Sequence, residues 1–92
     1  MKQRTFTIQN KLGIHMKPAG LLVREAGKYK SKISVYKDNM EHRKVNAKSL
    51  IGVLTLAAGK GSTVTVLADG EDEEQALNGL EDLIVRRKFD EE

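Results

Sequence analysis

The sequence predicts an α+β fold, an open-faced two-layer β-sandwich with a four-stranded antiparallel sheet and three helices on one face. Segments in which apolar and polar residues alternate are separated by segments with apolar residues at helical spacing. Their order is β-α-β-β-α-β-α, and packing every helix on one sheet is the economical way to bury the apolar stripes. The chain length suits a single domain over residues 1–92, and we expect a frayed tail over residues 87–92.

The first strand is predicted over Thr5–Gln9, where Phe6 and Ile8 would share one face. The strand is followed by a break in which Gly13 would allow an unusual backbone angle. A helix is then expected from Met16 to about Lys28, because apolar residues recur at helical spacing, namely Ala19, Leu22, Val23 and Ala26.

Two further strands and a short helix occupy the middle of the chain. Alternation predicts a strand over Lys32–Lys37, a polar hairpin over 38–43 and a short returning strand over Lys44–Asn46. Ser49 is a good N-cap for a helix from Leu50 to about Ala57. That helix is apolar nearly all round, so periodicity leaves open whether it is fully buried or presents a docking patch.

The last strand and helix have the strongest patterns. Ser62–Ala68 predicts a strand with Val64 and Val66 on one face. Asp72 and Gln75 have the spacing of a capping box, which predicts the start of the last helix. The apolar stripe of that helix comprises Ala76, Leu77, Leu80, Leu83 and Ile84.

Composition excludes several classes of function. The absence of cysteine excludes a disulfide framework, a thiolate metal site and a thiol nucleophile. No apolar run is long enough to span a bilayer and no leader is recognisable, so we expect a cytoplasmic protein without membrane insertion. We predict neither a metal nor a cofactor, and interpret His42 as a solvated loop residue.

The net charge of +3 includes a basic segment after the first helix, with lysines at positions 28, 30, 32 and 37. Such a segment is either solvated surface or a face that meets nucleic acid, an anionic membrane or an acidic protein. With two Phe, two Tyr and no Trp, the chain lacks an aromatic platform for stacking bases. We therefore expect no nucleic-acid partner.

The chemistry is concentrated in residues 13–19, Gly-Ile-His-Met-Lys-Pro-Ala. Pro18 is well tolerated in a first helical turn, which would place His15 at or beside the N-cap. The free N–H groups of that turn form an anion site, where His15 could accept a phosphoryl group and Lys17 could meet the incoming charge. The local pattern is also compatible with an ordinary surface histidine near a helix start.

Three segments, in order along the chain, resemble the HPr family of histidine-containing phosphocarriers of the bacterial sugar phosphotransferase system. Residues 13–19 resemble its active-site signature, residues 46–54 its regulatory-serine segment, and residues 68–77 the start of its last helix. The resemblance runs from about Phe6 to Ile84 and implies the open-faced architecture predicted above.

The resemblance implies a stoichiometric carrier rather than an enzyme. Enzyme I, charged by phosphoenolpyruvate, would phosphorylate His15 on Nδ1, and His15 would pass the group to sugar-specific enzyme IIA domains. Lys17 would be the phosphate-stabilising cation, and no metal or cofactor would take part.

The resemblance also implies a regulatory phosphosite at Ser49, modified by an HPr kinase/phosphorylase and read by a catabolite regulator. Partner proteins would dock on Leu50, Ile51 and Leu54, while Val53 and Leu56 would be buried. Helical spacing adds Met16 and Gly20 to this surface, because Gly20 falls on the same side as Met16 and would allow a partner to approach closely; a merely tolerated glycine is the alternative. The reading of Ser49 as a plain capping residue remains open at this stage.

The chain departs from the family pattern at four places. Lys17 stands where the family has arginine, Leu12 replaces a small polar residue, and Ala57 replaces a common glycine. The hairpin over 38–43 is about three residues longer than usual. Three hypotheses follow, in order of preference: a sugar-system phosphocarrier, a regulatory paralogue acting mainly through Ser49, and a basic nucleic-acid binder.

Overall fold

Four strands form one antiparallel sheet in the computed structural model, which describes residues 1–90. The spatial order is β1-β4-β2-β3, so the last strand in the sequence lies between the first two. The strands are β1 (Lys2–Thr7), β2 (Lys32–Lys37), β3 (Val45–Asn46) and β4 (Thr63–Asp69). The predicted sheet is therefore confirmed.

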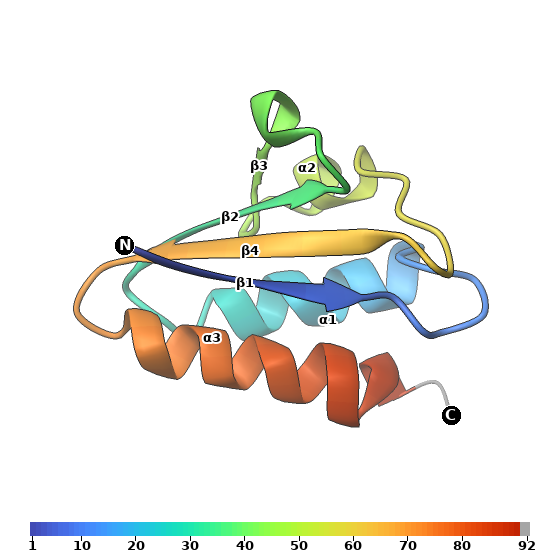
Figure 1. Ribbon diagram of the computed structural model, residues 1–92. Helices are drawn as coiled ribbons and strands as arrows, with labels where there is room; N and C mark the ends of the chain where they lie inside the picture. Colours follow the sequence, from blue (N-terminus) through green and yellow to red (C-terminus); the bar gives the residue numbers. More distant parts are fainter. Residues whose placement is uncertain (91–92) are drawn as a thin grey trace.

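Three α-helices accompany the sheet: α1 (Met16–Ala26), α2 (Leu50–Leu54) and α3 (Glu73–Glu81). Figure 1 shows α1 and α3 side by side beneath one face of the sheet. The short α2 packs against α1 and β3, and its Val53 belongs to the same core. None of the helices in residues 1–90 has the length and hydropathy needed to cross a membrane.

The core lies between the sheet and these helices. The predicted inward positions of the first and last strands are buried, namely Phe6, Ile8, Val64 and Val66, and so are Ile33 and Val35 on β2. The α3 stripe is buried in full and continues through a π-helical turn, Asp82–Arg86. Alternation along β4 sends Thr65 and Leu67 to the opposite face of the sheet, where the Thr65 hydroxyl bonds that of Thr5 at 2.8 Å.

The two long helices meet at Gly79. A Cβ at this position would lie 2.0 Å from the Oη of Tyr29, so only glycine allows the approach. That phenol donates to the buried Glu25 carboxylate at 2.8 Å. Burial and this hydrogen bond raise the pKa of Tyr29 to about 12.

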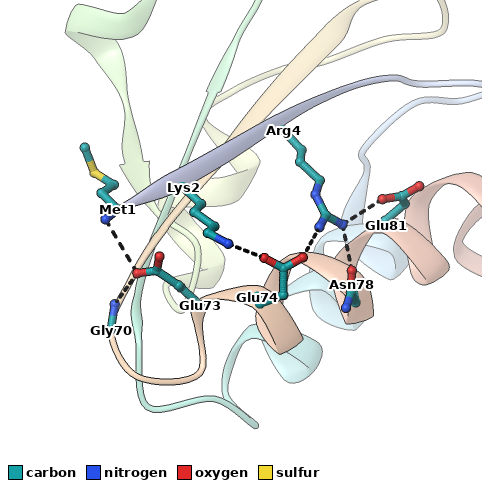
Figure 2. A network of polar contacts seen from close by, with 8 residues as sticks. All are labelled: Met1, Lys2, Arg4, Gly70, Glu73, Glu74, Asn78 and Glu81. Atoms are coloured by element: carbon teal, nitrogen blue, oxygen red, sulfur yellow. Dashed lines mark hydrogen bonds and ion pairs between the residues drawn. The ribbon is translucent and has the colours of Figure 1, made fainter.

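Ion pairs attach β1 to α3 on the outside of the core. Figure 2 shows Lys2 and Arg4 reaching Glu74, at 2.6 and 2.7 Å, while Arg4 also contacts Asn78 and Glu81. The hydrogen bond from Lys2 lowers the pKa of the Glu74 carboxyl, so this carboxylate stays ionised to a lower pH than an ordinary glutamate. These contacts hold the first strand against the last helix.

Three sequence expectations were wrong in detail. The first strand begins at Lys2 and ends at Thr7, earlier than predicted. The α2 helix ends at Leu54 rather than near Ala57, whose φ of 51° is left-handed and incompatible with continuing a helix. Asp72 forms no capping bond with its own helix.

The Asp72 carboxylate instead accepts bonds from the segment after α1. Its partners are the backbone N–H groups of Lys30 and Ser31 and the Ser31 hydroxyl, at 2.5 to 2.9 Å. The Ser31 hydroxyl is the main cause of the lowered pKa of Asp72. The side chain thus joins two distant segments, which a local capping pattern does not reveal.

The expected frayed tail is wrong for residues 87–90. Lys88–Asp90 form a 3₁₀ turn, and the side chain of Phe89 within it is fully buried in the core. Arg87 and Asp90 form a two-point ion pair at 2.6 and 3.0 Å. Apolar burial of one aromatic ring therefore fixes this end of the chain, and residues 91–92 lie outside the described part.

We predict that Phe89→Ala destabilises the protein by about 3 to 5 kcal/mol, as expected for truncating a buried aromatic ring. Urea unfolding followed by circular dichroism measures the change. Ile51→Ala is the matched control, because Ile51 is exposed and should cost less than about 1 kcal/mol. An equal, small effect of both substitutions would show that the tail is not part of the core.

Candidate functional site

His15 is the N-cap of α1, as predicted. Its backbone is extended (φ −95°, ψ −162°), and its carbonyl accepts the Ala19 N–H at 2.9 Å, which closes the first helical turn. The side chain is half-buried and makes no capping bond to its own helix. The imidazole therefore accepts no hydrogen bond from the N–H groups of the first turn.

Those N–H groups are available to an anion. Within residues 1–90 no acceptor bonds the backbone N–H of Met16 or Lys17, and Pro18 has no N–H. The positive end of the 11-residue helix dipole points the same way. Among residues 1–90, the first turn of α1 contains no acidic side chain.

The loop before the helix is rigidly held. Gly13 has a φ of +68°, and a Cβ there would lie 2.3 Å from the Ala58 carbonyl oxygen. That carbonyl also accepts the Ile14 N–H at 2.8 Å, and Asn10 Nδ2 donates to the Gly13 carbonyl at 2.6 Å. Gly13 thus supplies the unusual backbone angle that the sequence predicted, and residues 10–14 position His15.

Lys17 lies on the exposed side of the first turn, close to the C-terminal 3₁₀ turn. The pKa of the Asp90 carboxyl is lowered, first by its bond to Arg87 and to a smaller extent by the Lys17 charge. Asp90 was missed by sequence reasoning, because a tail expected to fray gives no signal of a fixed carboxylate. The terminal turn packs against α1, and the ion-pair partner of Asp90 is Arg87.

Ser49 caps α2 as predicted. Its Oγ accepts the Gly52 N–H at 3.1 Å, and its side chain is half-buried. The hydroxyl is therefore the acceptor for a first-turn N–H, and part of the residue faces solvent. Since α2 packs against α1, the helices that begin at Ser49 and His15 belong to one surface region.

Exposed apolar side chains accompany these helices. Met16 is 61% exposed, Ile51 77% and Leu50 38%, whereas Leu54 is partly buried against the core. Val53 and Leu56 are buried, as the family resemblance implied. Gly20 is partly exposed, and no atom would lie within 4 Å of a Cβ there.

Leu12 is a further apolar residue of this region that sequence reasoning did not assign to docking. It is 70% exposed in the loop that leads to His15. Its isolation in a polar loop was the available signal, because an exposed large hydrophobic residue often marks a contact surface.

Two departures from the family pattern, Ala57 and the long hairpin, have visible structural features. The φ of 51° at Ala57 explains the common glycine, since a Cβ in this region costs about 1 to 2 kcal/mol. The hairpin contains a 3₁₀ turn, Glu41–Arg43, and is tied to β4 by the bond from the Thr63 N–H to Asp38. His42 lies exposed in that turn.

The structure does not suggest a metal centre. Across residues 1–90, no three His, Asp or Glu side chains are grouped so that they could hold an ion.

Comparison with protein families gives a match over residues 2–86 to the family described as "PTS HPr component phosphorylation site". Among curated proteins, the chain is 45% identical over 87 residues to the phosphocarrier protein HPr of Cupriavidus necator, covering 95% of this chain and 94% of that one. It is also 40% identical over 80 residues to the HPr-like protein Crh of Halalkalibacterium halodurans, covering 87% and 92% of the two chains.

Solved structures agree with this assignment. The chain resembles HPr of Thermoanaerobacter tengcongensis with a TM-score of 0.90 and 48% sequence identity, over 100% of this chain and 99% of that one.

Proposed function

The chain belongs to the HPr family of phosphocarrier proteins of the phosphotransferase system, and from this we propose that His15 is its phosphoryl acceptor. The observation that carries the proposal is the position of His15 as N-cap of α1, beside two N–H groups that no acceptor bonds within residues 1–90. Enzyme I, charged by phosphoenolpyruvate, would be the donor, and enzyme IIA domains the acceptors.

The transfer requires a nucleophilic lone pair and groups that stabilise the negative charge of the phosphoryl oxygens. The neutral Nδ1 of His15 attacks phosphorus, an N–P bond forms, and the bond between phosphorus and the donor group breaks, with its electron pair returning to the donor. The three phosphoryl oxygens then face the N–H groups of Met16 and Lys17 and the Lys17 ammonium. In the next transfer, a nucleophile of the acceptor protein attacks phosphorus, and the N–P bond to His15 breaks.

The same features suit a carrier better than an enzyme with its own turnover. A helix N-terminus and one exposed lysine stabilise the phosphoryl group moderately, so the group can be both accepted and released. Exposed Met16, Leu50 and Ile51 offer an apolar surface to donor and acceptor proteins alike. We place this relay in the cytoplasm, as the sequence suggested.

We further propose that Ser49 is a regulatory phosphosite, a substrate for an HPr kinase/phosphorylase and a signal for a catabolite regulator. A phosphate there adds a charge of about −2 to a helix N-terminus that tolerates it. The same charge would lie beside Leu50 and Ile51 and repel acidic partners from that surface.

A second candidate function is that of a regulatory paralogue acting mainly through Ser49. The observation in its favour is the similarity to an HPr-like protein Crh, together with the capping geometry of Ser49. The two candidates differ in whether phosphorylation of His15 is required.

We predict that incubation with enzyme I and phosphoenolpyruvate gives one acid-labile phosphate per chain, detected by intact mass, and that His15→Ala abolishes it. Acid lability distinguishes phosphohistidine from phosphoserine, and Ser49→Ala is the matched control, which should keep the adduct. A wild-type chain that gains no labile phosphate while a kinase still modifies Ser49 would favour the regulatory paralogue.

Replacing the cation tests the electrostatic part of the proposal. We predict that Lys17→Ala slows phosphorylation of His15 by about tenfold or more, because a hydrogen bond to a charged group contributes about 1.5 to 3 kcal/mol. Lys17→Arg should retain or raise the rate, since arginine binds phosphate with two N–H groups. Rapid-quench labelling measures both rates, with Lys60→Ala as control; an unchanged rate in Lys17→Ala would remove Lys17 from the site.

The regulatory proposal predicts that Ser49→Asp slows phosphorylation of His15 by about tenfold or more, because like charges brought together at an interface cost several kcal/mol. Aspartate remains a good N-cap, so the helix itself should persist. Ser49→Ala loses the cap, at a cost of about 1 kcal/mol in stability, but should leave the rate unchanged. Equal rates for the wild type and Ser49→Asp would contradict regulation by charge.

A further inference from the structure

Four lysines surround two adjoining hollows at the end of the sheet where β2 begins. The larger hollow, of about 240 Å³, is lined by Lys30, Lys32 and Lys48 together with the polar residues Ser31, Ser34 and Asn46. The smaller, of about 160 Å³, is lined by the charged side chains of Lys32, Lys44 and Asp69 together with Met1, Ser34 and Leu67. Lys32 and Ser34 line both hollows, so the two are neighbours.

The charge of these hollows is not neutralised from within. No carboxylate of residues 1–90 forms an ion pair with the ammonium group of Lys30, Lys32 or Lys44. Lys48 is held in place, because its Nζ donates to the Tyr29 carbonyl at 2.7 Å. The four lysines of the two hollows therefore outnumber the one carboxylate that lines them, Asp69.

The nearby acidic groups have other partners as well. Asp69 and Met1 both line the smaller hollow, and the Asp69 carboxylate lies 3.8 Å from the Met1 amino group. Asp72 accepts its bonds from the backbone of Lys30 and Ser31 and from the Ser31 hydroxyl, and so fixes the loop that carries the lysines. This loop enters β2, which lies between two other strands. Hydrogen bonds therefore hold the backbone that carries Lys30 and Lys32.

We propose that these two hollows bind the diphosphate group of a small molecule. Lysine is a strong point charge for phosphate, and the Ser34 hydroxyl and Asn46 amide can donate to its oxygens. Lys32 and Ser34 line both hollows, so a diphosphate group bound between the hollows would meet lysines from each. No aromatic side chain lines either hollow, so neither offers a stacking surface for the bases of nucleic acid.

The inferred site is separate from the phosphoryl site. Figure 1 shows the start of α1 and the start of β2 at opposite ends of the molecule. The 11-residue α1 that lies between them is about 16 Å long at 1.5 Å per residue. The inference goes beyond the proposed phosphoryl relay and can fail without affecting it.

Isothermal titration calorimetry with pyrophosphate, at fixed ionic strength, tests the inference on the full chain. We expect saturable binding of one pyrophosphate, weakened about tenfold or more in Lys30→Gln/Lys32→Gln, because two charge-assisted contacts are lost. Lys11→Gln/Lys60→Gln is the matched control: it removes the same charge from exposed lysines outside the hollows and should change the affinity less than about twofold.

NMR chemical-shift changes give a second readout that does not depend on affinity. Binding at the inferred site should move the amide signals of residues 30–34 and 44–48 and leave those of residues 13–20 in place. Three results would overturn the inference: no saturation by pyrophosphate, equal weakening in both double variants, or shifts confined to the start of α1. Saturation by a single-stranded oligonucleotide but not by pyrophosphate would also overturn it, in favour of a nucleic-acid surface.

Discussion

Burial of one face of β4 beneath α1 and α3 is the constraint on which the other features depend. Val64, Val66 and Ala68 are all essentially inaccessible to solvent, and β4 pairs with β1 on one side and β2 on the other. The central strand is thus the last to appear in the sequence, and its partners come from the first half. The other elements pack around this covered face of β4.

That constraint also exposes the site. Because Ala19, Leu22 and Ala26 anchor α1 in the core, the N-terminus of the helix projects at an edge of the molecule, with His15 at its end. The contact of Gly13 with the Ala58 carbonyl fixes the angle at which the chain enters the helix. A moderate anion site on a rigid support is what a phosphoryl carrier needs, since the group must be both bound and released.

The two ends of α1 have different chemistry for a physical reason. At its start, α1 carries His15 at the N-cap and Lys17 in the first turn. Beyond its end, the chain turns into β2 with Asp72 holding the backbone, and the lysine side chains are left to face solvent. The first arrangement suits the transfer of one phosphoryl group and the second suits the binding of a phosphorylated small molecule.

Local sequence patterns correctly predicted the strand over Lys32–Lys37, the buried stripe from Ala76 to Ile84, and the cap positions of His15 and Ser49. These are local properties, set by residues a few positions apart. The partners of Asp72 and the burial of Phe89 are visible only in the folded chain. Such contacts join residues distant in the chain. Because they are stabilised by burial in the folded protein, no local sequence pattern predicts them.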